Sequence, residues 1–362
     1  MNIKKLIKYI AVLSISFVLQ SAYAIKIGIT LPTQNISRWY FDGKEMEAFL
    51  IKNGHDVQLY YGGDGDVELQ KNQIERMISD GCQMIVVAPI DSKAFIKELE
   101  KAHKAGITVV SYDLMLTESE NVDYFITFDS ERIGAEQAFY LLDALEINKN
   151  PGTTPKNIEI FAGSTKDQNA KLMWQGVRNV LKPYLDKKDL NIPSNAVSMG
   201  YASIADNSED KAYKRMLYLI EKQNYGVSKD KVHLDAIISP SESITLGIVK
   251  ALKKAGFAEY EYPYIISADL DIASEMCIYK RQIDMGVYKD YKALHKALLS
   301  IANAKSQNKV VKLEDNDTYY NGAKYLATLT CESIPVTLDN ISTVIKSNNR
   351  IENFVALSSK NF

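Results

Sequence analysis

The chain has 362 residues and a formal net charge of −2, with 43 basic and 45 acidic side chains. The sequence contains no block of basic residues, which argues against nucleic acid or an anionic membrane as the main partner. The length exceeds what one small core needs and suits two domains.

The first 24 residues have the composition of a secretory signal peptide. Three lysines between positions 4 and 8 precede an apolar stretch too short to span a bilayer, and Ala22-Tyr23-Ala24 forms a small-residue cleavage site. We expect cleavage after Ala24, which would lower the net charge to about −5. A membrane anchor is the alternative, and a lipoprotein is not expected because no cysteine follows the apolar stretch.

After this segment, short apolar runs typical of strands alternate with stretches of helical period. In chain order, the expected strands are 26–31, 56–61, 84–88, 107–112, 124–128, 158–162, 197–201, 234–238, 264–267, 283–288 and 323–329. The expected helices are 39–53, 67–80, 94–105, 133–145, 170–182, 210–223, 244–255 and 291–304. Strands joined through helices of this length require right-handed crossovers and parallel sheets covered on both faces. The pattern predicts an α/β fold with two doubly wound parallel-sheet lobes.

Nearly every strand-like run ends on a polar side chain. In chain order these residues are Arg38 with Trp39, Asp113, Asp167 with Asn169, Glu242, Asp269 and Lys289. The carboxyl ends of parallel strands border the ligand crevice of an open α/β sheet, so we expect these side chains to converge on one cleft. Carboxylates accept hydrogen bonds from sugar hydroxyls, cationic groups donate to them, and Asn does both. Together with an aromatic face for the ring, the set predicts a monosaccharide site.

Several of these residues also have a structural explanation. Trp39 could belong to the core, and Lys289 could be a solvated lysine at a strand end. Asp113 and Asp167 could cap the elements that follow them.

The cysteines and glycine-rich loops do not indicate a metal or a cofactor. Cys82, Cys277 and Cys331 lack metal-ligand spacing, although the last two could pair in an oxidising compartment. The loops 62–65 and 162–165 match neither a dinucleotide fingerprint nor a Walker pattern. We therefore expect no cofactor and no bound metal.

A set of short stretches runs through almost the whole chain after the signal segment. They are Pro32-Thr33 with Ser37-Arg38-Trp39, residues 73–78 with Gly81, Ser111-Tyr112-Asp113, residues 125–129, Ala162-Gly163-Ser164, residues 167–171, 180–184 and 287–290, and Asn321-Gly322. In this order they resemble the xylose-binding and multiple-sugar-binding proteins of bacterial ABC uptake systems, which are type I periplasmic binding proteins.

The resemblance implies a periplasmic, monomeric protein that captures a pentose or hexose between two hinged lobes and delivers it to a membrane ABC permease. It implies no catalysis, and docking to a chemoreceptor also occurs in the family. We expect an N-terminal lobe of residues 25–130 plus 268–314 and a C-terminal lobe of residues 131–267 plus 315–362.

Carried over residue by residue, the family's sugar contacts fall on Arg38, Trp39, Asp113, Asp167, Asn169, Asp269 and Lys289. The chain departs from the family at three places. Leu114 stands where relatives have a sugar-binding arginine, Ser241-Glu242 replaces an Asn-Asp or Tyr-Asp pair, and Ser267-Ala268-Asp269 is one residue shorter than the usual Ser-Gly-Gln-Asp. A lost donor leaves a buried acceptor unpaired at a cost of about 1–3 kcal/mol, which favours a ligand without that hydroxyl, such as a modified sugar or polyol, or a bridging water.

Other functions can be set against this one. A glycosidase needs two suitably placed carboxyl groups, and a site rich in Arg, Lys and Asn serves binding better. A DNA-binding regulator on this fold needs a helix-turn-helix ahead of the first lobe, where this chain has the signal segment. A sensor of a different small polar molecule, acting in signalling or chemotaxis, is not distinguished from an uptake protein by the sequence.

Overall fold

The computed structural model describes residues 24–149, 154–270, 272–309, 311, 313 and 317–347. They form two units. Unit 1 contains the segments up to Phe128 and from Asp290 to Glu332, and unit 2 contains Asp129–Lys289 and the segment from Ser333 onward. The chain therefore passes between the units after residues 128, 289 and 332. Apart from Ala24, the expected signal peptide lies outside the described residues.

Unit 1 is built on a parallel sheet in the order β11-β5-β4-β3-β1-β2. Its strands are β1 (Lys26–Leu31), β2 (Asp56–Tyr61), β3 (Met84–Val87), β4 (Thr108–Tyr112), β5 (Tyr124–Phe128) and β11 (Ala327–Cys331). Every residue of β3 and β4 is buried, as expected for central strands covered on both faces.

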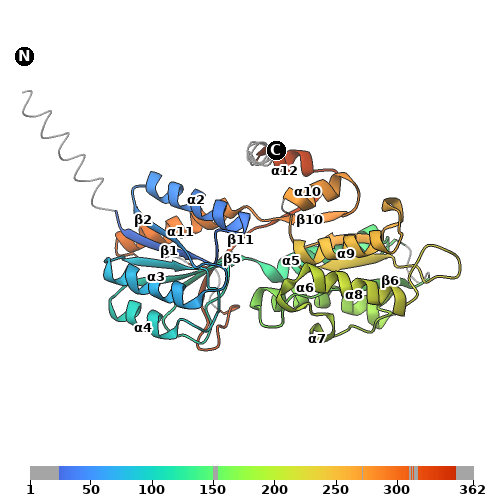
Figure 1. Ribbon diagram of the computed structural model, residues 1–362, viewed down its shortest axis with the longest axis horizontal. Coiled ribbons are helices and arrows are strands. Elements are labelled where there is room, and N and C mark those ends of the chain that lie inside the picture. The colour runs from blue at the N-terminus through green and yellow to red at the C-terminus, as the bar shows by residue number, and fades with distance from the viewer. Residues whose placement is uncertain are drawn as a thin grey trace, which may run out of the picture. The chain divides into compact units, whose positions relative to one another are not determined.

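Four helices cover this sheet: α2 (Ser37–Lys52), α3 (Val67–Ser79), α4 (Ile96–Lys104) and α11 (Tyr291–Ser306). Helix α2 packs against α11 on one face, and α3 packs against α4 on the other (Figure 1). Because α11 follows the second passage between the units, unit 1 is completed by residues from late in the chain.

Unit 2 repeats this plan with a sheet in the order β12-β10-β9-β8-β6-β7. Its strands are β6 (Lys156–Ile160), β7 (Leu190–Asn191), β8 (Ala236–Ser239), β9 (Tyr264–Ser267), β10 (Met285–Tyr288) and β12 (Ile334–Thr337). The described neighbours pair in parallel except β10 and β12, which are antiparallel.

Seven α-helices are described in unit 2: α5 (Ser130–Ala144), α6 (Gln168–Asp186), α7 (Met199–Ala202), α8 (Glu209–Lys222), α9 (Glu242–Lys254), α10 (Ile272–Tyr279) and α12 (Ile341–Ser347). Helix α8 packs against α9, and α5 packs against α6 (Figure 1). The α5–α6 contact is unusually close. A Cβ atom added to Gly134 would stand 2.0 Å from the carbonyl oxygen of Met173, and one on Gly176 would stand 2.0 Å from that of Glu131.

The predicted fold class of two parallel-sheet α/β lobes is confirmed, and some details differ. The run 197–201 does not form a strand, because helix α7 occupies most of it, and the sequence did not indicate β12, α10 or α12. The expected division also placed 268–289 in the first lobe and 315–332 in the second. Strand β10 instead pairs with β9 and β12 in unit 2, and β11 pairs with β5 in unit 1.

All three cysteines are free, so Cys277 and Cys331 do not form the disulfide that the sequence allowed.

No helix in the described part of the chain has the length and apolar character needed to cross a bilayer.

Candidate functional site

In unit 1, the predicted sugar-binding residues lie at the carboxyl ends of the strands. The chain leaves β1 for β2 at one edge and then returns to β3 on the other side of β1, which makes a topological switch point between β1 and β3. Arg38 and Trp39 begin the helix that follows β1, and Asp113 directly follows β4. The topology thus brings together residues separated by about 75 positions in the sequence.

Arg38 is the centre of this group. Its guanidinium donates to the carboxylate of Asp113 and lies over two aromatic rings, 4.0 Å from the centroid of Trp39 and 4.6 Å from that of Tyr291. Burial opposes the charged form, but Asp113, Tyr291 and Asp42 outweigh it, so the pKa of Arg38 is raised well above its ordinary value. The side chains of Arg38 and Asp113 remain 23% and 12% exposed, which leaves both groups accessible to a ligand.

The backbone fixes the position of Asp113. Its φ of 58° lies in the left-handed region, which Asp tolerates better than most residues. The amide of Asp113 donates to the carbonyl of Ile126 at 2.7 Å, and the Thr127 hydroxyl donates to the carbonyl of Asp113 at 3.3 Å. Leu114 follows, partly buried, and its carbonyl accepts from the Ser111 hydroxyl at 2.7 Å.

Unit 2 carries a second group at the carboxyl ends of its strands. Asp269 follows β9 and Lys289 follows β10, and their side chains pair at 2.6 Å between Nζ and Oδ1. The other oxygen of Asp269 accepts from the backbone amide of Glu242, the first residue of α9, at 3.4 Å. The side chains of Lys289 and Asp269 are 19% and 29% exposed, so this pair is also accessible to a ligand.

Asp167 and Asn169 lie at the start of α6, after β6. Asp167 is the N-cap residue of this helix, and its carboxylate accepts from the amide of Asn169 at 2.9 Å. The capping role considered from the sequence is therefore present. Both residues lie at the same edge of the unit 2 sheet as Asp269 and Lys289, because β6, β8, β9 and β10 run in parallel.

Sequence reasoning missed one aromatic residue of the unit 1 group. Tyr291 contributes a ring face to Arg38 and makes an edge contact with Phe128. The sequence feature that could have indicated Tyr291 is an aromatic residue two positions after Lys289, where the chain returns to unit 1. The alternative that Trp39 belongs to the core agrees with its burial, since the residue is only 6% exposed. Its ring also lies against the guanidinium of Arg38.

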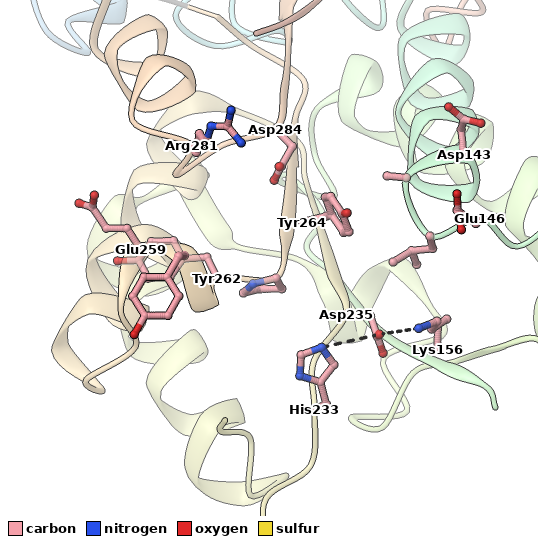
Figure 2. A pocket seen from close by; sticks show the side chains of 14 residues that line it. Asp143, Glu146, Lys156, His233, Asp235, Glu259, Tyr262, Tyr264, Arg281 and Asp284 are labelled. Atoms are coloured by element: carbon pink, nitrogen blue, oxygen red, sulfur yellow. Dashed lines mark ion pairs between the residues drawn. The ribbon is translucent and has the colours of Figure 1, made fainter. Parts of the chain in front are cut away.

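A separate hollow of about 700 Å³ lies at the opposite, amino edge of the unit 2 sheet. Figure 2 shows its lining, with Asp235 paired to Lys156 at 3.3 Å and to His233 at 3.8 Å. Asp235 and Asp284 each accept from a backbone amide of a neighbouring strand at 2.8 Å, so both carboxylates fasten strand ends. Burial raises the pKa of Asp284 to about 6.

Comparison with known proteins gives a consistent result. Residues 27–309 match the family described as "Periplasmic binding protein domain". The chain is 32% identical to the multiple sugar-binding periplasmic receptor ChvE of Rhizobium radiobacter, over 88% of each protein. It is 27% identical to the D-xylose-binding periplasmic protein of Escherichia coli, over 90% of this chain and 91% of that protein.

A solved structure extends this likeness to three dimensions. An ABC transporter solute-binding protein from Clostridium phytofermentans, with bound beta-D-glucose, superposes with a TM-score of 0.79 at 31% identity. The match covers 88% of this chain and 96% of that one. Since both the family match and the close relatives span most of the sequence, the chain belongs to the periplasmic binding protein family.

Proposed function

We propose that this protein is a periplasmic solute-binding protein that captures a monosaccharide and delivers it to a membrane ABC permease. The observation that carries the proposal is the Arg38–Asp113 pair, which is partly exposed at the carboxyl edge of the unit 1 sheet and supported by the Trp39 ring. A cation and a carboxylate in contact present donors and acceptors side by side, as vicinal sugar hydroxyls require.

The unit 2 group offers a second set of possible partners for a sugar. Asp269 and Lys289 repeat the pairing of an acid with a base, and Asp167, Asn169 and Glu242 add oxygen and amide groups at the same sheet edge. A sugar that bonds to residues of both units stabilises the state in which both groups reach it, and this differential contact is what would drive closure.

No catalytic step is part of the proposal. Asp113 and Asp269 are each paired with a cation, which favours hydrogen bonding to a ligand over proton transfer. The relatives described above are likewise named for sugar binding, and the solved neighbour is a solute-binding protein with bound beta-D-glucose.

Leu114 and Glu242 are proposed to set the choice of sugar. An aliphatic side chain next to Asp113 cannot donate to a hydroxyl, so the favoured ligand lacks a hydroxyl at that position or keeps a water there. Glucose, a modified hexose, a pentose and a polyol are the chemical classes to compare.

The direct test is isothermal titration calorimetry of the mature protein, after removal of co-purified ligand, with pentoses, hexoses, deoxysugars and polyols. We expect one or a few of these sugars to bind and to raise the melting temperature by mass action. If no sugar binds, the proposed ligand class is wrong, and mass spectrometry of the co-purified material would identify what occupies the protein.

A further inference from the structure

Beneath the Arg38–Asp113 pair lies a second group of polar side chains that a ligand cannot reach. Asp42 Oδ1 accepts from the Tyr112 hydroxyl at 2.9 Å and lies 2.6 Å from His295 Nε2. The side chains of Asp42 and His295 are 0% and 2% exposed, and Tyr112 is fully buried. We call Asp42, Tyr112 and His295 the inner tier, and Arg38, Asp113 and Tyr291 the outer tier.

The two tiers are in register on the same three elements. Helix α2 supplies Arg38 and, one turn later, Asp42, while α11 supplies Tyr291 and, one turn later, His295. The end of β4 supplies Tyr112, and Asp113 follows it. Each tier therefore joins α2, α11 and the end of β4, which gives a shift in one tier a direct path to the other.

The inner tier lowers the stability of the fold compared with apolar side chains at the same places. No described residue hydrogen-bonds the second carboxylate oxygen of Asp42, which is fully buried. A buried carboxylate with an unpaired oxygen is destabilising, and an apolar side chain would pack there without that penalty. Such a cost is expected where a charge serves the site rather than the fold.

The charge of Asp42 acts on the outer tier. It is one of the carboxylates that raise the pKa of Arg38, so it attracts the guanidinium and favours its place beside Asp113. Burial and the same carboxylates raise the pKa of Tyr112, so its hydroxyl stays protonated and continues to donate to Asp42. Tyr112 is also the residue immediately before Asp113, whose left-handed backbone permits little adjustment.

We propose that Asp42, held by Tyr112 and His295, is a positioning residue that fixes the orientation of the Arg38–Asp113 pair and so sets sugar affinity without touching the sugar. This inference rests on the proposed function. The predicted sugar contacts Arg38 and Asp113 belong to the outer tier, and the inner tier acts only through them.

Tyr112→Phe tests the proposal because it removes one hydroxyl and keeps the ring in the core. A matched control is Tyr225→Phe in unit 2, where the hydroxyl of a 3% exposed tyrosine donates to the buried Glu159 at 2.6 Å. Both variants lose one buried hydroxyl–carboxylate bond, so both melting temperatures are expected to fall. Calorimetry is expected to show an affinity loss of about tenfold for Tyr112→Phe and less than about twofold for Tyr225→Phe.

A spectroscopic readout follows the outer tier without any ligand. The chain has two tryptophans, and a Trp174→Phe background leaves only Trp39, whose ring lies against Arg38. In this background, Tyr112→Phe is expected to shift the Trp39 emission maximum and increase its quenching by acrylamide, whereas Tyr225→Phe leaves both unchanged. Unchanged Trp39 emission together with unchanged affinity in Tyr112→Phe would overturn the proposal.

His295 provides a rescue experiment if Tyr112→Phe fails to fold. His295→Gln retains an N–H donor for Asp42, and His295→Leu removes it. Affinity and Trp39 emission are expected to stay near wild type in His295→Gln and to change in His295→Leu. Equal behaviour of the two variants would show that the inner tier only packs. If the wild type binds no sugar, the proposed function fails, while the emission measurements still decide whether the two tiers are coupled.

Discussion

At the scale of single residues, Asp113 meets two demands at one position. Its backbone lies at φ 58°, where alanine would be strained, and its carboxylate pairs with Arg38. Asp113→Asn separates these demands, because Asn tolerates the same backbone and loses only the charge. We expect sugar affinity to fall by at least about tenfold, measured by calorimetry, with little change in melting temperature. Wild-type affinity in this variant would remove Asp113 from the ligand site.

Leu114 lies next to that carboxylate and is partly buried. Leu114→Arg introduces a multidentate donor at this position. We expect it to change the ranking of sugars in favour of those with a hydroxyl in reach of Arg, by about tenfold or more. Leu114→Met, which keeps the volume and adds no donor, is the control. The same ranking in all three proteins would show that residue 114 does not select the sugar.

Asp284, in the hollow of Figure 2, is expected to make the stability of the fold depend on pH. Burial raises its pKa from 3.8 to about 6, so the folded protein binds this proton more tightly than the unfolded chain. Its contribution to stability is therefore present below about pH 4 and is lost as pH rises through about 6.

Asp284→Asn keeps an acceptor for the Ile265 amide and removes the charge. We expect the variant to exceed wild type by about 1–3 kcal/mol in urea unfolding at pH 8 and to match it near pH 3.5. Asp143→Asn removes an exposed carboxylate from the same hollow without touching that bond. An equal gain from both variants would attribute the effect to the overall charge of the hollow instead of to Asp284.

The sequence indicated which side chains stand at the strand ends better than it indicated the contacts that depend on helix packing. Arg38, Asp113, Asp269 and Lys289 could be found because each follows a recognisable strand, and strand ends meet at one sheet edge. Tyr291 and the His295–Asp42 pair depend on how α11 packs on α2, which joins positions about 250 residues apart. No local pattern encodes that packing, so a buried His or Asp in a helix looks like any other polar residue until the helices are placed.

At the scale of elements, the predicted secondary structure was wrong where an apolar run of the sequence is not buried in the structure. The run 197–201 looks apolar, but Val197 and Tyr201 are 46% and 77% exposed, so no sheet covers them and the chain turns into α7. Strand β12 escaped notice because it contains Pro335, which central strands exclude. It is tolerated here because β12 is an edge strand of its sheet.

The α5–α6 contact gives a prediction at this scale. In most helices, replacing Gly by Ala stabilises the fold by about 1 kcal/mol. Gly134→Ala is expected to do the opposite and cost about 2–3 kcal/mol in urea unfolding, because its Cβ would meet the backbone of α6. Gly200→Ala in α7, where nothing lies within 4 Å of the added carbon, is the control. A neutral Gly134→Ala would mean that the two helices can separate at little cost.

At the scale of the whole molecule, the proposed function requires that one ligand engage both units. Hydrogen–deuterium exchange with and without the best sugar from the calorimetric panel tests this. We expect slower exchange in unit 1 after β1 and β4 and, in the same experiment, in unit 2 after β8 and β9. A sugar from the panel that does not bind is the control. Protection confined to one unit would contradict capture by both.

The passage of the chain between the units also determines when each can be completed. Unit 1 lacks α11 and its edge strand β11 until the whole of Asp129–Lys289 has been made, and unit 2 lacks β12 until β11 has been made. In a partly synthesised chain, therefore, the hydrophobic core of neither unit is complete. The native contacts that complete the units join distant parts of the sequence, which slows folding. Such a chain reaches its native form only after its last segments have been made, so removal of the final strands would leave both units incomplete.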